Sequence, residues 1–196
     1  MISAVILAAG KSTRLGLSKQ LLEINGRTII EHVIKNVCES TVAETIVVLG
    51  FMADKIIDKT RSCNIKIVLN RAYESGMSSS LRAGLKAVNK DADAVIFVLA
   101  DQPLVKAPVL NKLISEYERK KPLIVVPTYK GKRGNPTLVD RALFNEIKRI
   151  SGDVGARSLI EKYRKNVEEI EMNSPGVLID IDTAEEFKLI KKRLYT

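Results

Sequence analysis

Three positively charged residues follow the first apolar run of the chain within nine positions of one another. The run is Ala4-Val5-Ile6-Leu7, the small residues Ala8, Ala9 and Gly10 come next, and the cations are Lys11, Arg14 and Lys19. The apolar run is typical of a buried strand, and small residues after it let a ligand approach the backbone. Arg and Lys neutralise phosphate charge, so the pattern indicates a ligand with several phosphate groups. A solvated basic loop is the alternative, because runs of charge often only face solvent.

Two familiar phosphate-binding motifs are excluded by the spacing of this segment. A P-loop needs a glycine five residues before Gly10, where Val5 stands. A Rossmann turn needs its first two glycines two positions apart, but Ser12 stands where the second would be. The phosphate site must therefore be of another kind.

Two aspartates follow other apolar runs. Asp101 comes after Ala94–Leu99, and Asp182 comes after Val177–Ile181, which we also expect to be a strand. Mg²⁺ takes one or two carboxylates together with phosphate oxygens, so the sequence predicts a Mg²⁺ site at Asp101 and Asp182. Whether Asp180 also contributes stays open.

Each of these acids also has a purely structural interpretation. Asp101 could form the turn before Pro103. Asp182 or Thr183 could cap a helix, because two glutamates follow at 185 and 186.

A glycine- and serine-rich segment, Asn70 to Leu81, joins a predicted strand to a predicted helix. The N-terminus of a helix exposes unpaired N–H groups, and small hydroxyl residues there can pair with the edge of a ligand. For any single serine, ordinary helix capping is the alternative.

The fold that positions these residues is indicated by alternating periodicities. Strand-like runs occur at 4–7, 45–49, 65–69, 94–99 and 123–127, and helical patterns occur around Ile29–Val37, Leu81–Val88 and Leu110–Tyr117. This alternation predicts a three-layer α/β/α fold, Rossmann-like, around a mostly parallel sheet. Ligands of such sheets bind at the carboxyl ends of the strands, where Gly10 and Asp101 are expected.

Length and composition limit the possible classes of protein. A chain of 196 residues with 45% hydrophobic and 28% charged residues predicts one globular domain, 1–196. No apolar run is long enough to span a bilayer and no signal peptide is visible, so we expect a cytoplasmic protein without a membrane partner. Cys38 and Cys63 are interpreted as reduced thiols.

The net charge of +9 favours anionic partners. Nucleic acid is disfavoured, because acidic residues are interleaved with the basic ones and only 5% of residues are aromatic, although an RNA-binding protein stays an alternative. His32 is the only histidine, which argues against a multi-histidine metal site or a histidine-dependent nucleophile.

Taken together, five blocks of the sequence resemble the MobA-like nucleotidyltransferases, and most of all their molybdenum cofactor cytidylyltransferase branch. The blocks are LAAG with Ser12, Arg14, Gly16 and KQLL (residues 19–22), GMSSSL (76–81), LADQP (99–103), GDVGAR (152–157) and DIDT (180–183). The resemblance extends from Ile2 to about Ile190. It implies a Mg²⁺-dependent transfer of CMP from CTP to the terminal phosphate of a pterin, with release of pyrophosphate.

The resemblance also implies roles for individual residues. Lys19, Arg14 and Asp101 would be catalytic, and Asp101 and Asp182 would hold Mg²⁺. The nucleotide would contact Leu7, Ala8, Ala9, Gly10, Lys11, Arg14, Lys19, Asn70, Gly76, Ser78, Ser79 and Ser80. Because the guanylyltransferase branch carries glycine where Ala9 stands, CTP is favoured over GTP.

The acceptor would be bound by a basic loop and the GDVGAR block. The residues implied are Lys132, Arg133, Gly134, Asn135, Asp153 and Arg157. The family tends to carry Gly-His-Pro where this chain has Gly134-Asn135-Pro136, so the acceptor is less well defined than the chemistry. Another phosphorylated acceptor and a nucleotide-binding regulator without turnover are the alternatives, and the acceptor molybdoenzyme or its chaperone is a conceivable protein partner.

Overall fold

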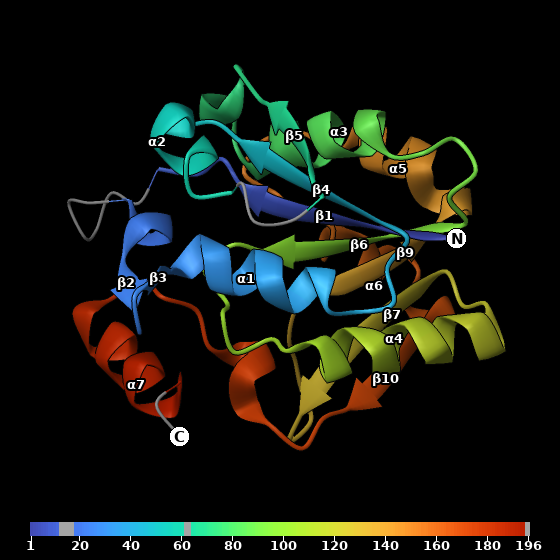
Figure 1. Cartoon of the computed structure of the whole chain (residues 1–196). Helices are drawn as coiled ribbons and strands as arrows, with labels where there is room; N and C mark the ends of the chain where they lie inside the picture. Colours follow the sequence, from blue (N-terminus) through green and yellow to red (C-terminus); the bar gives the residue numbers. More distant parts are fainter. Residues whose placement is uncertain (12–17, 61–63, 195–196) are drawn as a thin grey trace.

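The computed structural model describes residues 1–11, 18–60 and 64–194. In this part of the chain a central mixed sheet has eight strands, in the order β10-β7-β9-β6-β1-β4-β5, with β8 paired to β7 (Figure 1). The strands are β1 Ile2–Ala8, β4 Glu44–Leu49, β5 Lys66–Leu69, β6 Ala94–Leu99, β7 Ile124–Tyr129, β8 Lys132–Arg133, β9 Thr137–Asp140 and β10 Val167–Glu171. A separate hairpin joins β2 Glu23–Ile24 to β3 Arg27–Thr28.

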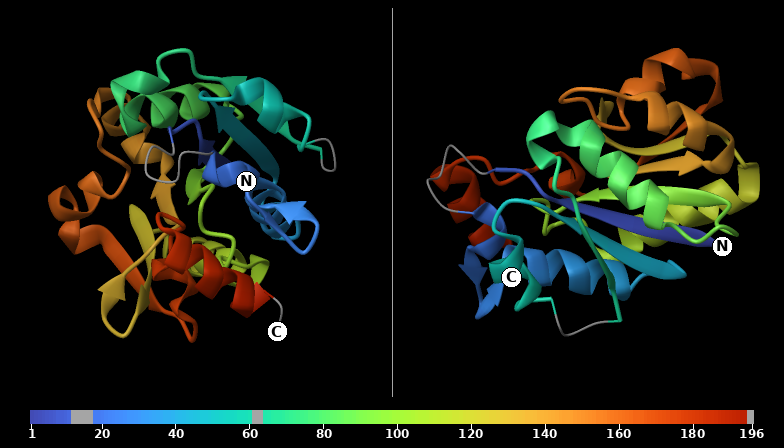
Figure 2. Two further views of the ribbon diagram at one scale, coloured as in Figure 1. Left: turned by 90° about the vertical axis from the view of Figure 1, so that its left-hand side faces the viewer. Right: turned by 90° about the horizontal axis from the view of Figure 1, so that it is seen from above.

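The direction of the strands places most of their carboxyl ends at one edge of the sheet. β1, β4, β5 and β6 are mutually parallel. β9 is antiparallel to both β6 and β7, so β7 runs in the same direction as β6, and β10 is parallel to β7. The carboxyl edge faces the reader in the left view of Figure 2.

Helices cover both faces of the sheet, which gives three layers (Figures 1 and 2). On one face, α1 Ile29–Cys38 and α4 Ala107–Lys120 pack against alternate residues of β1 such as Ile6. On the other face, α3 Met77–Ala87, α5 Phe144–Arg149 and α6 Ser158–Lys162 pack against residues that include Val5. Because both faces are covered, the central strands are continuous apolar runs, and the predicted fold class is confirmed.

Two further helices border the carboxyl edge. α2 Ala53–Ile57 follows β4, and α7 Ala184–Leu194 packs on the hairpin through Ile24, Ile29, Ile181 and Ile190. Short 3-10 turns complete the described chain: η2 Lys19–Leu21, η3 Tyr73–Ser75, η4 Arg141–Leu143, η5 Arg164–Asn166 and η6 Pro175–Leu178. No helix of the described residues has the length and apolar character needed to cross a bilayer.

The segment before Asp182 is the one predicted strand that is wrong. Residues 175–178 form η6, and 179–183 are irregular. Val177 is buried in the main core cluster and Ile181 packs with Ile24, Ile29 and Ile190, but neither residue is in a strand. Ile181 N donates one hydrogen bond to Asp101 O over 3.2 Å. The apolar run that follows Pro175 and Gly176 is thus buried without forming hydrogen bonds to a neighbouring strand.

Candidate active site

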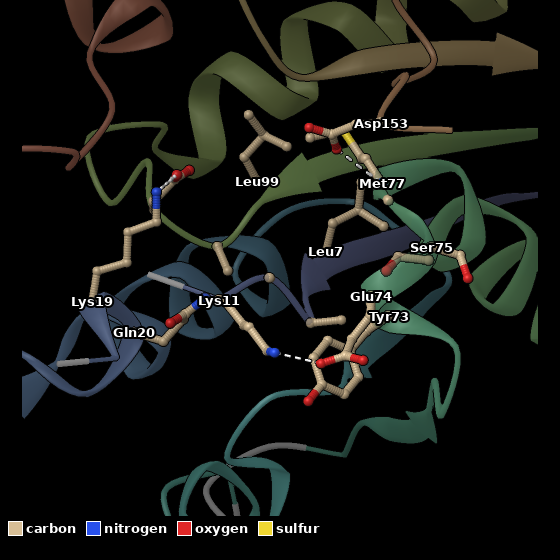
Figure 3. A pocket seen from close by; sticks show the side chains of 16 residues that line it. Leu7, Lys11, Lys19, Gln20, Tyr73, Glu74, Ser75, Met77, Leu99 and Asp153 are labelled. Atoms are coloured by element: carbon tan, nitrogen blue, oxygen red, sulfur yellow. Dashed lines mark hydrogen bonds and ion pairs between the residues drawn. The ribbon is translucent and has the colours of Figure 1, made fainter. Parts of the chain in front are cut away.

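A cavity of about 820 Å³ opens at the carboxyl ends of β1 and β6 (Figure 3). Its walls come from the end of β1 and the segment after it, from η2, from η3 and the start of α3, from the end of β6 and the residues after it, and from one residue before α6. The lining residues are Leu7, Ala9, Gly10, Lys11, Lys19, Gln20, Tyr73, Glu74, Ser75, Gly76, Met77, Ser80, Leu99, Ala100, Asp101 and Asp153. The volume lies in the range of small-molecule sites.

The pairing of β1 with β6 brings the two predicted motifs together. Leu7 is opposite Leu99 in the parallel register, and Ala100 N donates to Leu7 O over 3.2 Å. Gly10 and Asp101 therefore follow neighbouring strands at the same edge, as expected from the sequence.

Lys19 contacts both predicted metal ligands. Its Nζ donates to Asp101 Oδ2 over 2.5 Å and to Asp182 Oδ1 over 3.0 Å. The side chains of Lys19 and Asp101 are 17% and 16% exposed, whereas that of Asp182 is 42% exposed. Burial by itself would lower the pKa of Lys19, but the two carboxylates outweigh it and hold that pKa above its usual range. Lys19 is therefore a permanent positive charge beside two carboxylates.

The carboxylates suit a divalent cation that also binds phosphate. Asp101 Oδ1 is buried and has no hydrogen-bond partner among the described residues, so this atom can accept a metal ion. No group of three or more His, Cys, Asp or Glu side chains that could hold a metal occurs in the described part of the chain. A site of two carboxylates completed by phosphate oxygens is what Mg²⁺ prefers.

Asp180 takes part in the same cluster through another partner. Gln102 Nε2 donates to Asp180 Oδ1. Burial, together with the nearby charges of Asp101 and Asp182, raises the pKa of Asp180, while the bond from Gln102 lowers it. Asp180 is thus a neighbour of the predicted metal ligands, held by a neutral amide.

The acidic segment is fixed at its far end by a helix cap. Thr183 Oγ1 accepts from Glu186 N over 3.2 Å, and Glu186 Oε2 accepts from the backbone N–H groups of Asp182 and Thr183 over 2.8 Å. Thr183 has the capping role that the sequence offered as an alternative. The Asp182 side chain instead contacts Lys19.

The start of α3 is held by the GDVGAR block. Gly76 has φ +93°, and a Cβ there would lie 2.5 Å from Gly152 C. Met77 N donates to Asp153 Oδ1 over 3.1 Å, and Ser78 N donates to Gly152 O over 3.2 Å. Asp153, which the resemblance assigns to the acceptor, thus lines the same cavity as the predicted nucleotide-binding residues.

Of the predicted serines, only Ser80 lines the cavity. Asn70 Nδ2 donates to Ser79 Oγ over 2.8 Å and to Ser80 Oγ over 3.0 Å, and Ser79 Oγ donates to Gly76 O over 2.8 Å. Ser78 is completely buried. Asn70, Ser78 and Ser79 therefore lie behind the cavity wall, where the bonds of Asn70 and Ser79 hold the turn before α3. Ala8 is likewise buried in the core.

One wall of the cavity carries a charge pair that the sequence analysis missed. Lys11 Nζ forms an ion pair with Glu74 Oε1, and it lies 5.7 Å from the centre of the Tyr73 ring (Figure 3). The contact with Glu74 raises the pKa of Lys11, and the contact with Lys11 lowers the pKa of Glu74. Tyr73 and Glu74 could have been found from the sequence, because they stand two or three positions before the GMSSSL block.

Apart from Asp153, the predicted acceptor residues lie outside the lining of this cavity. Lys132 and Arg133 form β8, and Gly134 N donates to Pro127 O of β7 over 2.8 Å. Asn135 N donates to Val177 O over 3.0 Å. A Cβ on Gly134 would be 2.3 Å from the same oxygen, so this position requires glycine.

Arg133 and Arg157 stabilise the loop that contains them. Arg133 contacts Glu169 Oε1 over 2.7 Å and Glu161 Oε1 over 3.0 Å. Arg157 Nη2 donates to Arg133 O over 2.6 Å. Lys132 is exposed, whereas Arg133 is half-buried. Arg14 lies among residues 12–17, outside the described residues.

An α/β sheet with a cavity at its carboxyl edge, lined by small residues together with Lys11, Lys19 and Asp101, is typical of a nucleotide-binding α/β protein. Residues 4–167 match the MobA-like NTP transferase domain, so the chain belongs to this family of nucleotidyltransferases.

Three curated relatives align with almost the whole chain. The chain is 28% identical to nicotine blue oxidoreductase of Paenarthrobacter nicotinovorans (94% of each chain), and 27% identical to purine catabolism protein PucB of Bacillus subtilis (97% of this chain, 96% of the relative). It is 26% identical to the molybdenum cofactor cytidylyltransferase of Escherichia coli (98% and 96%). The names of these three relatives describe different chemistry. The comparisons therefore establish the family of this chain but not its substrate.

Solved structures agree with the fold. The homologue of Mycobacterium tuberculosis Rv0371c from Mycobacterium sp. strain JC1 has a TM-score of 0.88 at 30% identity, over 99% of this chain and 96% of that one. Rv0371c of M. tuberculosis in complex with manganese has a TM-score of 0.83 at 26% identity, over 97% and 98%.

Proposed function

We propose that this protein transfers CMP from CTP to the terminal phosphate of molybdopterin or the molybdenum cofactor and releases pyrophosphate. The observation that supports this most is the cluster of Lys19, Asp101 and Asp182, of which Lys19 and Asp101 line a cavity of about 820 Å³. Phosphoryl transfer needs positioning and charge neutralisation more than covalent chemistry, and this cluster supplies both signs of charge.

Asp101 and Asp182 would hold Mg²⁺, which would stabilise negative charge on the phosphates when bound. The manganese complex of Rv0371c supports a divalent cation in a related protein. Lys19, released from the two carboxylates, would then contact phosphate oxygens, whose negative charge would take the place of the carboxylates in stabilising the ammonium group.

The remaining cavity residues would position the nucleotide. The small side chains of Ala9 and Gly10 let phosphates approach the backbone after β1, and Lys11 can turn from Glu74 toward them. Gly76, Met77 and Ser80 form the wall on which the base would lie. Ala9 in place of the glycine of the guanylyltransferase branch favours CTP.

The acceptor would enter beside β8, where Lys132 is exposed. An oxygen of its terminal phosphate would attack the α-phosphorus of CTP in line, and the P–O bond to pyrophosphate would break. No covalent intermediate with the protein is needed. The protein that receives the finished cofactor, a molybdoenzyme or its chaperone, would be the partner.

A different acceptor is the second candidate. It is favoured by the differing names of the relatives and by Asn135 in place of the histidine of the family pattern. A regulator that binds nucleotide without turnover is the third.

Pyrophosphate release from each of the four NTPs with Mg²⁺, with and without molybdopterin, separates these candidates. We expect release that requires both CTP and molybdopterin. Release with GTP instead would assign the protein to guanylyl transfer, and release only with another acceptor would support the second candidate. Binding of CTP without release, for every acceptor tried, would indicate the regulator.

A further inference from the structure

A second cavity, of about 480 Å³, lies between α3 and α5, and we call it the α3–α5 groove. Five cations line it: Arg82, Lys86, Lys90, Arg141 and Lys148. The other lining residues are Leu85, Val88, Phe144 and Asn89, so no acidic side chain lines the groove. The groove therefore combines an apolar floor with positively charged walls.

The groove lies at the edge of the sheet opposite the nucleotide cavity. Lys86 is in the last turn of α3, and Lys90 is in the loop that leads into the amino end of β6. Arg141 follows Asp140, which is paired with Ala94 at that same amino end. A molecule bound in the groove would thus leave the nucleotide cavity open.

Among the described residues, no carboxylate forms an ion pair with the five cations of the groove. Arg82 Nη1 donates to the Ile150 carbonyl, Arg141 Nε donates to Ala92 O over 2.7 Å, and Lys148 Nζ donates to Asn145 Oδ1 over 3.2 Å. These partners are neutral. Lys86 and Lys90 are exposed at the rim. Elsewhere cations contact acids, as Lys120 contacts Glu168 over 2.5 Å and Lys162 contacts Glu146 over 2.6 Å.

Of the acids at this edge of the sheet, Asp91 is exposed next to Lys90 in the sequence, and two others are engaged by other groups. Glu44 Oε1 accepts from Asn89 N over 2.6 Å and from Ser3 Oγ over 2.5 Å. Asp93 forms an ion pair with the chain N-terminus, and Arg141 contributes only weakly to the lowering of its pKa. The groove therefore retains a positive potential that an anionic partner can use.

We propose that the α3–α5 groove docks an acidic, amphipathic segment of a partner protein. Apolar side chains of the segment would cover Leu85, Val88 and Phe144, while its carboxylates would meet the cations on the two walls. A small polyanion would form ion pairs with Lys86 and Lys90, but it would not bury the apolar side chains of the groove. A single-stranded nucleic acid would find one half-buried ring, Phe144, instead of a stacking platform. The amphipathic acidic segment is the ligand that matches both properties of the groove.

The test uses a fluorescent synthetic peptide of alternating glutamate and leucine, with the full-length protein. We expect saturable binding that weakens with added salt and that moves the amide NMR signals of Leu85, Lys90 and Phe144. The triple variant K86E/K90E/K148E should bind at least about tenfold more weakly. Saturating CTP and Mg²⁺ should leave the affinity unchanged, because the groove is remote from the nucleotide cavity.

The matched control is K188E/K191E/K192E, which removes the same charge from three exposed lysines of α7. It should bind the peptide like the parent, and circular dichroism should show that both variants are folded. Lack of saturable binding, equal weakening in both variants, or NMR changes outside the groove would overturn the proposal. So would tighter binding to the groove of tripolyphosphate, of a single-stranded oligonucleotide, or of an all-glutamate peptide.

Discussion

Lys19 Nζ lies 2.5 Å from Asp101 Oδ2, although the two residues are 82 positions apart in the sequence. The distance is short because β1 and β6 are neighbours and end at the same edge of the sheet. Asp101 follows a buried strand, so a rigid scaffold holds its carboxylate. The second carboxylate, Asp182, is on an irregular segment attached by Ile181 N to Asp101 O. The rigid acid of the pair is therefore the one on which the metal site depends.

Replacing Asp101 by Asn tests this dependence. The substitution keeps the shape of the side chain and removes its charge, so kcat for pyrophosphate release should fall by about 100-fold or more. The melting temperature should stay close to that of the parent, because the amide oxygen of Asn can still accept from Lys19 Nζ and Lys19 keeps its contact with Asp182. Steady-state kinetics and thermal unfolding measure the two effects.

The matched control is Asp91→Asn, an exposed acid at the opposite edge of the sheet, which should leave kcat unchanged. Near-normal turnover by a well-folded Asp101→Asn protein would show that Asp101 only shapes the turn before Pro103. The catalytic role given to Asp182 would then be wrong as well.

The preference for the base can be measured without an acceptor. At equal concentrations with Mg²⁺, CTP should raise the melting temperature more than GTP, UTP or ATP, because a ligand that binds only the folded state stabilises it by mass action. A larger shift with GTP would contradict the interpretation of Ala9 and would assign the cavity to a purine.

The sequence predicted the parts of this site that follow buried strands. Periodicity located β1 and β6, and the rule that ligands bind at carboxyl ends then placed Gly10 and Asp101 together. The same signal failed at 177–181, because an apolar run shows burial but not hydrogen-bond pairing. It also missed β10, since three of its five residues are glutamates and the strand is at the edge of the sheet.

Side-chain partners were less predictable than positions. The ion pair of Lys11 with Glu74 joins residues 63 apart, and the bonds of Arg133 to Glu161 and Glu169 depend on how β8 and β10 lie beside α6. Such contacts join residues that are far apart in the sequence, so local sequence patterns cannot predict them. This is why two basic residues that look equivalent, Lys132 and Arg133, differ in the structure.

That difference leads to a prediction for the acceptor loop. Lys132→Ala should raise the KM for the acceptor severalfold and leave the affinity for CTP unchanged, because Lys132 lies outside the lining of the nucleotide cavity. Lys188→Ala, an exposed lysine on α7, is the control. Initial rates at varied acceptor concentration and CTP titration give the two quantities. A loss of CTP affinity in Lys132→Ala would mean that the loop serves the nucleotide.

Gly76 and Gly131 allow backbone strain to be separated from a steric collision. Both have positive φ, +93° and +72°, so alanine is strained at either position. A Cβ at Gly76 would lie 2.5 Å from Gly152 C and 2.6 Å from Asp153 N, whereas a Cβ at Gly131 would have nothing within 4 Å.

Gly131→Ala should therefore lower the free energy of unfolding by about 1 kcal/mol and leave the KM for CTP unchanged. Gly76→Ala should cost about 2–3 kcal/mol, because the GDVGAR block must also move away from the start of α3. It should raise the KM for CTP as well, since Met77 and Asp153 line the cavity on either side of that contact. Chemical denaturation and steady-state kinetics of the two variants provide the comparison, and equal stability loss with an unchanged KM would show that the contact between Gly76 and Gly152 has no part in forming the nucleotide site.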